Sequence, residues 1–272
     1  MQVLAKCRNR MFQAARSAAF CALFCLASFA LASPYAPKTL IPETAEAIDI
    51  LKNAHLVAGG ALWQRPKTLY MRGSATLYQD GRADRKSVAD HYEMWREYPA
   101  WNASAHAPSG KVRIDALSSG KTLFQIAFDG KNTYNQNGLM QGAAASKEWA
   151  EAFGFGIIRF ALDGGFTRLR LADDDVDAKR CFTLLITDPN KGQTTFWIDQ
   201  NSYEIRKVGF DTPKGWHERV YSEFFRLDNG WLQPGRVRLS YRGALSNDVR
   251  WTQAVVNSAI PAEQFLIAPA KK

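Results

Sequence analysis

Apolar and polar residues alternate along most of the chain in short runs that end at turn-forming residues. Val237, Leu239 and Tyr241, for example, alternate with polar residues, which is the pattern of a strand with one buried face. Asp-Gly and Asn-Gly pairs between the runs supply the positive φ angles that tight hairpins need. This pattern predicts strands at residues 69–78, 87–98, 111–117, 122–128, 132–135, 180–187, 194–198, 203–210, 219–227, 231–241 and 249–256.

Two segments break this alternation with apolar residues at helical spacing. The first follows Thr44, a residue that can cap a helix, and ends at Gly59-Gly60. The second spans Ser146 to Ala161. Because consecutive hairpins cannot build parallel β-α-β units, we predict an α+β fold with one antiparallel sheet. If the sheet curves, its apolar concave face needs a cover, which the two helices can provide.

The N-terminal 32 residues have the pattern of a secretory signal. Lys6 and three arginines precede an apolar run from Ala18 to Leu31, which is too short to span a membrane. We therefore predict export and cleavage after Ala32, with a retained N-terminal anchor as the alternative. No repeat, low-complexity tract or flexible linker divides residues 33–272, so we predict that they form a single domain.

The charge and the cysteines of the chain limit the kinds of partner and of chemistry that we expect for it. Four of the 35 basic residues lie in the leader, which leaves 31 against 26 acidic residues. The basic residues are scattered, so a nucleic-acid-binding stripe is not indicated. Only Cys181 follows the leader, and it lies in an alternating run. We expect a buried side chain there, with a nucleophilic thiol as the alternative.

Motifs for catalysis or metal binding are missing from the sequence. His55, His91, His106 and His217 do not occur at metal-binding spacings, and no serine elbow, phosphate loop or paired-cysteine motif is present. The densest acidic cluster, Asp173 to Asp177, lacks the glycine and the terminal glutamate of a calcium loop, so we expect a solvated turn. These observations favour a binding protein over an enzyme, with no cofactor and no metal.

Aromatic residues make up 12% of the chain, and many of them alternate along the predicted strands. Loose packing of helices against the sheet would leave an apolar cavity able to hold an acyl chain, whereas tight packing would leave a solid core. Most individual aromatic residues are expected to belong to the core. The candidates for lining a ligand site are Trp95, Phe124, Phe128, Phe153, Ile157, Phe182, Phe196, Phe224 and Trp251.

Four segments give the chain a resemblance to a known family. They are residues 54–63 before the first strand, 128–134 after the middle hairpin, the hairpin 198–207 and the ending 256–265. Their order resembles the periplasmic lipoprotein carriers of the LolA/LolB type. The resemblance implies a strongly curved, unclosed antiparallel sheet, or half-barrel, with helices over the concave face and a hydrophobic cavity. Those carriers latch a helical lid with an arginine, which we match to no arginine here.

The resemblance and the residue patterns together suggest a function at the cell envelope. We expect a periplasmic carrier or binding protein for a lipid, a lipoprotein acyl chain or another hydrophobic ligand. A membrane-associated donor or acceptor protein would be a further partner. Two alternatives stay open. One is an envelope assembly or structural factor that binds a partner protein through the concave face, and the other is an envelope hydrolase whose site the sequence does not reveal.

Overall fold

The computed structural model of the protein describes residues 40–41, 45–101, 109–141 and 154–268. These residues belong to one compact unit, which spans Tyr35–Lys272. The predicted signal sequence with its cleavage site, the first half of the second predicted helix, and the candidate residue Phe153 lie outside the described residues. The signal and the single-domain organisation therefore stay predictions.

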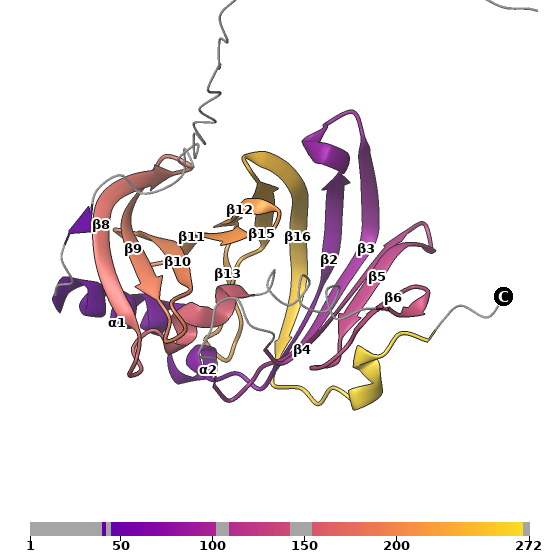
Figure 1. The fold of residues 1–272 in the computed structure, drawn as a ribbon, viewed down its shortest axis with the longest axis horizontal. Helices are drawn as coiled ribbons and strands as arrows, with labels where there is room; N and C mark the ends of the chain where they lie inside the picture. The colour runs from indigo at the N-terminus through magenta and orange to yellow at the C-terminus, as the bar shows by residue number, and fades with distance from the viewer. Residues whose placement is uncertain (1–39, 42–44, 102–108, 142–153, 269–272) are drawn as a thin grey trace, which may run out of the picture. The chain divides into compact units, whose positions relative to one another are not determined.

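Strands dominate the described part of the chain, as the alternating pattern predicts (Figure 1). Within the described residues, fourteen strands form one sheet and two short strands form a separate hairpin. The large sheet contains β1 (Leu40–Ile41), β2 (Thr68–Tyr78), β3 (Lys86–Glu97), β4 (Lys111–Ser118), β5 (Lys121–Phe128), β6 (Thr133–Asn135), β7 (Gly138–Leu139), β8 (Thr167–Val176), β9 (Lys179–Thr187), β10 (Gln193–Asp199), β11 (Ile205–Thr212), β12 (Gly215–Ser222), β15 (Arg236–Tyr241) and β16 (Ala244–Val256). The hairpin consists of β13 (Phe225–Arg226) and β14 (Leu232–Gln233).

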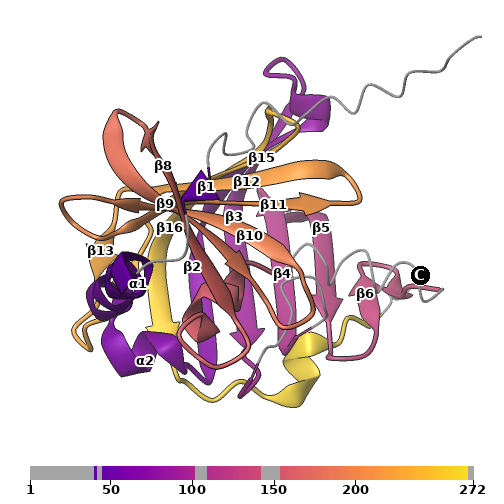
Figure 2. The same cartoon turned by 60° about the vertical axis from the view of Figure 1, so that its left-hand side comes forward.

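The large sheet is built from two meanders of antiparallel strands. The first runs from β2 to β7, and the second runs through β8 to β12, β15 and β16, with β1 added at its outer edge. The two meanders join where β16 pairs with β2. Figures 1 and 2 show the strong curvature of the sheet. Within the described residues β1 and β7 remain its two edges, so the sheet is antiparallel, curved and not closed, as expected.

Short helices accompany the sheet. They are α1 (Ala45–Ala58), α2 (Gly60–Gln64) and the 3-10 helices η1 (Gln79–Gly81), η2 (Gly154–Phe160) and η3 (Ala262–Phe265). Helix α1 confirms the first predicted helix, and Gly59, with a φ angle of 133°, separates it from α2. Helix η2 is the described end of the second predicted helix. That helices cover the concave face stays a prediction.

The helices of the described residues were also compared with the dimensions of a bilayer. None of them combines the length and the apolar character that crossing a membrane requires.

The alternating pattern does not predict β8, although it is a strand of 10 residues. Asp173–Asp175, which we expected in a solvated turn, lie in this strand. Arg170 forms an ion pair with Asp173, and Trp197 Nε1 donates a hydrogen bond to Asp174 Oδ2 over 3.1 Å. These partners, one within β8 and one on β10, hold the acidic residues in a conformation that their strand propensity disfavours.

The predicted strands 219–227 and 231–241 are each interrupted. Strand β12 ends at Ser222 because Glu223 has a positive φ of 54°. Pro234, which has no backbone N–H to donate, separates β14 from β15. The interruptions produce the β13–β14 hairpin, which leaves the large sheet and packs against α1. This hairpin forms part of the wall described next.

Candidate ligand-binding cavity

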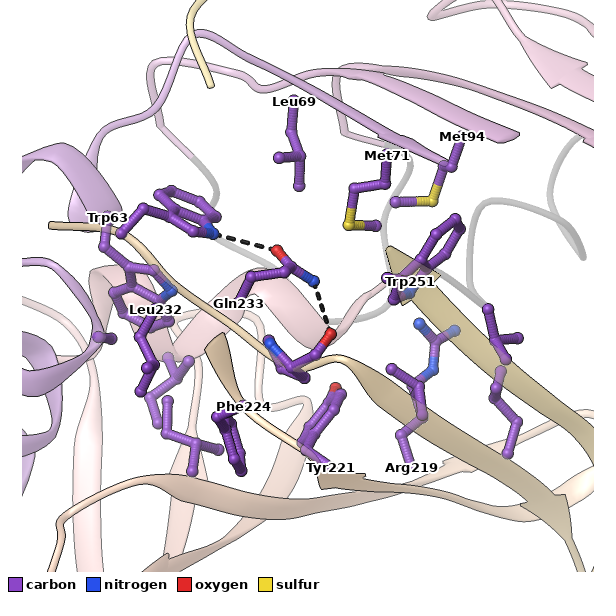
Figure 3. A pocket seen from close by; sticks show the side chains of 18 of the residues that line it. Trp63, Leu69, Met71, Met94, Arg219, Tyr221, Phe224, Leu232, Gln233 and Trp251 are labelled. Atoms are coloured by element: carbon purple, nitrogen blue, oxygen red, sulfur yellow. Dashed lines mark hydrogen bonds between the residues drawn. The ribbon is translucent and has the colours of Figure 1, made fainter. Parts of the chain in front are cut away.

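A cavity of about 290 Å³ lies between strands of both meanders and the β13–β14 hairpin (Figure 3). This volume is about twice the ~150 Å³ of an engineered apolar cavity that stays dry and binds benzene. It is close to the lower end of the range of about 300–1,000 Å³ that is common for small-molecule sites. Apolar and aromatic side chains supply most of the lining. The described fold therefore contains room for a small apolar ligand.

The alternation of side chains along the strands determines which residues form the apolar wall of the cavity. Leu69 and Met71 of β2 are both buried, and they line the cavity together with Met94 of β3. Trp251 of β16 completes this side, as Figure 3 shows. Methionine side chains are unbranched and polarisable, so they adapt to ligands of different shape. The wall combines two flexible thioethers with one rigid indole ring.

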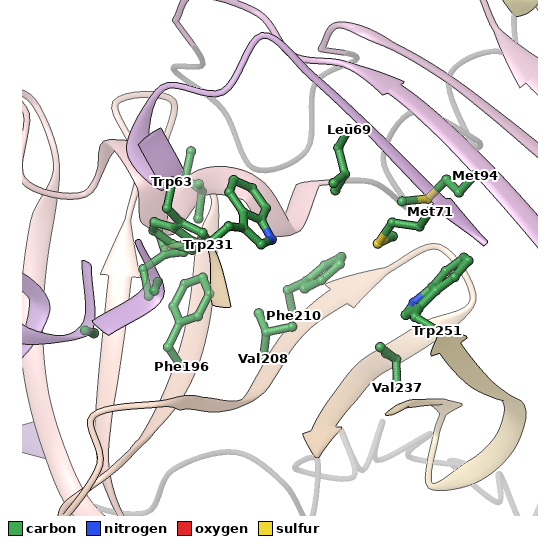
Figure 4. Close-up of a cluster of buried hydrophobic side chains, with 14 of the residues drawn as sticks. Trp63, Leu69, Met71, Met94, Phe196, Val208, Phe210, Trp231, Val237 and Trp251 are labelled. Carbon is green, nitrogen blue, oxygen red and sulfur yellow. The ribbon is translucent and has the colours of Figure 1, made fainter. Parts of the chain in front are cut away.

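The cavity borders a cluster of buried hydrophobic side chains, part of which Figure 4 shows. Phe196, Phe210 and Trp231 are almost fully buried there. The indole Nε1 of Trp231 donates to Gln233 Oε1 over 3.1 Å, and Gln233 Nε2 donates to the carbonyl oxygen of Pro234 over 3.0 Å. These bonds satisfy polar groups that would otherwise be costly to bury. Hydrogen bonds between neighbouring residues of the β13–β14 hairpin therefore hold this side of the wall in place.

Arg159 of η2 brings a positive charge to the cavity wall. Its guanidinium carbon lies 4.1 Å from the ring centre of Trp63, 5.0 Å from that of Trp231 and 5.1 Å from that of Tyr98. The Nη1 atom also donates to the carbonyl oxygen of Trp63. Burial lowers the pKa of Arg159 to about 10, so the group is charged at neutral pH. The aromatic faces stabilise this cation through their quadrupoles.

A buried histidine fastens α1 to η2. His55 Nε2 lies 2.8 Å from the carbonyl oxygen of Ile158, and Gln64 Nε2 lies 2.6 Å from His55 Nδ1. This arrangement fits a neutral ring that donates from Nε2 and accepts at Nδ1. Burial lowers the pKa of His55 from its ordinary value of 6.5. Nearby, Arg65 Nη2 forms an ion pair with Asp163 Oδ2 at 2.6 Å, and together these contacts position η2.

A second arginine reaches the cavity from β12. Arg219 lines the cavity beside Tyr221, and its Nε donates to His217 Nε2 over 2.9 Å. His217 in turn donates from Nδ1 to the carbonyl oxygen of Ser240 over 3.0 Å. Burial, with the nearby charge of Arg219, lowers the pKa of His217 to about 3. A neutral His217 therefore holds the side chain of Arg219 in place.

The two buried histidines predict a loss of stability in mild acid. Their pKa values are lower in the folded than in the unfolded protein, so below about pH 6.5 only the unfolded chain takes up these protons. Each pH unit below that point should cost about 1.4 kcal/mol per histidine until the folded pKa is reached. Urea unfolding at pH 7.5 and pH 5.0 measures this, and His217 alone should contribute about 2 kcal/mol.

His217→Gln provides the control for this prediction. The variant lacks the titrating ring, so its stability should change less between pH 7.5 and pH 5.0 than that of the wild type. Asp199 and Asp248 do not interfere, because their pKa values are lowered from an ordinary value of 3.8 and they titrate below this window. An unchanged pH dependence in the variant would show that His217 is not the group responsible.

Four of the nine predicted ligand-site residues lie around the cavity, and these are Phe124, Phe196, Phe224 and Trp251. Trp95 instead borders a separate groove with Tyr70, because its neighbours Met94 and Arg96 are the buried residues at this end of β3. The other described candidates lie outside the cavity wall: Phe128 and Ile157 are buried in the core, and Phe182 packs against Tyr203. That any of the nine binds a ligand stays a prediction.

Sequence reasoning missed several residues of the cavity wall. Met71 and Met94 lie on predicted strands, but the search favoured aromatic residues over methionines. Trp63 and Trp231 lie beside turns, where alternation gives no direction. Arg159 interrupts an apolar run from Ile157 to Phe160, and a charge inside such a run was the one available signal.

Two kinds of group can be located among the described residues, namely potential metal ligands and the free cysteine. No group of three or more potential metal ligands occurs among these residues. Cys181 is fully buried, as predicted, and burial raises the pKa of its thiol to about 11. Because the thiolate is the reactive form, such a thiol is a poor nucleophile at neutral pH.

The fold can be compared with known proteins. No protein-family model and no curated protein sequence matches the chain. A solved DUF1329 family protein from Desulfovibrio piger has a TM-score of 0.53 and 8% identity, over 82% of this chain and 98% of the other. A Vibrio parahaemolyticus domain described as an outer membrane lipoprotein-sorting protein has a TM-score of 0.46 and 13% identity, over 81% and 96%.

A LolA superfamily protein from Nitrosomonas europaea also has a TM-score of 0.46, with 15% identity over 80% of this chain and 96% of the other. The structural neighbours thus include the superfamily that the sequence resembles. At these identities the likeness concerns the fold alone.

Proposed function

We propose that this protein binds one amphiphile by burying its apolar chain in the cavity, as a carrier or binding protein of the cell envelope. The observation that carries the proposal is the apolar cavity of about 290 Å³ beside a large cluster of buried hydrophobic side chains. Native interiors contain few voids larger than a water molecule, since empty space forfeits dispersion contacts. A cavity of this size is therefore better explained by an occupant than by poor packing.

Burial of the chain supplies the affinity in this proposal. Each methylene that leaves water contributes about 0.8 kcal/mol, and apolar area contributes about 25 cal/mol per Å². Met71 and Met94 let the wall adjust to chains that differ in shape. A lipid or a lipoprotein acyl chain belongs to this ligand class. The envelope location rests on the signal-like pattern of residues 1–32.

Native mass spectrometry of the protein purified without detergent tests the proposal. We expect a population heavier than the bare chain by the mass of one amphiphile, and denaturation should release that molecule. In Val237→Phe the added ring enters the cavity from β15, so the heavier population should disappear. Val88→Phe makes the same change at an exposed position of β3 and should retain it.

Two results would count against the proposal. The first is a wild-type spectrum without any bound amphiphile, both as purified and after incubation with fatty acids. The second is an amphiphile that Val237→Phe retains as well as Val88→Phe does, since that molecule would lie outside the cavity. Either result would favour the alternative in which the concave face binds a partner protein.

A further inference from the structure

We infer that the cavity selects amphiphiles with an anionic head group, and that Arg159 and Arg219 hold this head. The inference rests on the proposed function, because it assumes that the cavity has an occupant. It adds the chemical class of the head group, which the apolar wall does not specify. Three observations lead to it, and they concern the partners of Arg159, the position of Arg219 and the sign of the charge around the cavity.

The partners of Arg159 are unusual for a charge inside a protein. Among the described residues they are the carbonyl oxygen of Trp63, the side chain of Tyr98 and the aromatic rings around the guanidinium, and they include no carboxylate. Removing a cation from water costs several kcal/mol unless an anion or a set of acceptors compensates. Among the described residues, its hydrogen bonds go to the carbonyl oxygen of Trp63 and to the side chain of Tyr98, whereas a guanidinium group carries five N–H donors.

Arg219 reaches the same cavity from a different element of the fold. It lies on β12, whereas Arg159 lies on η2, and both line the wall. His217 fixes the Nε edge of Arg219 by accepting its hydrogen bond. Figure 3 shows Arg219 next to Tyr221, on the strand that runs beneath the cavity. Two guanidinium groups from different elements thus converge on one apolar space.

The charge around the cavity is positive on balance. Among the described wall residues, Glu204 is the one carboxylate. Its Oε2 atom lies 3.5 Å from Nη2 of Arg206, a residue that does not line the cavity. Arg96 is buried on β3 close behind, where burial and then the charge of Arg219 lower its pKa. The charge of Arg96 in turn contributes to the lowered pKa of Arg159. An anion at the cavity wall would be attracted by this positive charge.

Guanidinium groups suit a particular class of head group. Their planar N–H donors match the paired oxygens of a carboxylate or a phosphate, and they are more weakly hydrated than an ammonium group. The shared chemistry is an anionic oxygen acceptor at the end of an apolar chain. A free fatty acid and a phospholipid-type phosphate both present it, so the experiment has to distinguish them.

The test compares head groups at constant chain length. Decanoate, decyl phosphate, decanol and decylamine are titrated into the full protein at pH 8 below their micelle concentrations. We expect at least one anion to bind at least about tenfold more tightly than decanol, since hydrogen bonds to charged groups are the stronger ones. Decylamine should bind most weakly. The stronger of the two anions identifies the head group.

Variants assign this preference to Arg159. In Arg159→Met the anion and decanol should bind within about threefold of each other, while decanol binding itself should change little. Arg159→Lys keeps the charge and should keep most of the preference, which a purely structural role would not predict. Arg250→Met is the matched control: Arg250 is exposed on β16 between the wall residues Val249 and Trp251 and forms an ion pair with Glu223 at 2.5 Å.

Each outcome separates the inference from the proposed function. Equal affinity for both anions and decanol in the wild type would overturn the head-group inference while the cavity remained a binding site. A preference that Arg159→Met and Arg250→Met reduce equally would overturn it too. If no decyl compound binds, the proposed function itself fails. Should Arg159→Met not fold, the wild-type affinities and Arg159→Lys still decide the matter.

Discussion

Gly73→Ala is expected to destabilise the protein by more than about 4 kcal/mol, or to prevent folding, which is exceptional for a single substitution. A Cβ atom at Gly73 would lie 1.8 Å from the carbonyl oxygen of Arg250 and 2.9 Å from the Cα of Trp251. Both are backbone atoms of β16, so no rotamer change can relieve the overlap. Gly73 pairs with Trp251 exactly where β2 joins the two meanders. Urea unfolding of the purified variant measures the effect.

Gly164→Ala is the matched control for this prediction. Nothing lies within 4 Å of a Cβ at Gly164, and its φ is not in the left-handed region. The control should therefore be neutral or slightly stabilising, because alanine reduces the freedom of the unfolded chain. If Gly73→Ala unfolds at the same urea concentration as Gly164→Ala, then β2 and β16 do not approach each other so closely that a side chain at position 73 is excluded.

Local sequence patterns predicted most of the strands. Asp129-Gly130 and Asn137-Gly138 mark turns between short paired strands, and the described chain follows them. These features depend on neighbouring residues alone, namely turn chemistry and the two-residue period of a strand. They were sufficient to give an antiparallel sheet, and the resemblance to a family added its curvature and its open edges.

Features that depend on distant residues were not predictable in this way. Strand β8 was missed because Asp173 and Asp174 are held by Gln200 and Trp197, which lie 27 and 23 residues further along the chain. The pairing of β2 with β16 joins strands from opposite ends of the chain, and no local pattern encodes it. The same reasoning covers Gly73, whose requirement for a bare Cα comes from the backbone of Arg250 and Trp251 on the facing strand.

The candidate site shows the same limit at the level of side chains. Alternation gives the two faces of a strand but not which face is concave, so Trp95 was chosen where the adjacent Met94 lines the cavity. Phe124, Phe196, Phe224 and Trp251 lie in the cavity wall, and that they bind a ligand stays a prediction. The two arginines of the wall, Arg159 and Arg219, come from η2 and β12, and no local pattern indicates that these two elements border the same cavity.

The second large effect concerns the length of the ligand's apolar chain. If the cavity takes up an alkyl chain, each added methylene should improve binding by about 0.8 kcal/mol until the space is full. Scaling from the ~150 Å³ cavity that holds benzene, the space should accept about a dozen carbon atoms. From hexanoate to dodecanoate the affinity should therefore rise by about 5 kcal/mol, which is more than a thousandfold.

Isothermal titration calorimetry of the full protein with this series of alkyl carboxylates is the most direct test of the account. We predict one binding site, an affinity that rises with each methylene and then levels off near twelve carbon atoms, and a negative heat-capacity change from apolar burial. An affinity that does not depend on chain length, or the absence of binding across the whole series, would contradict the claim that the cavity exists to hold an apolar chain.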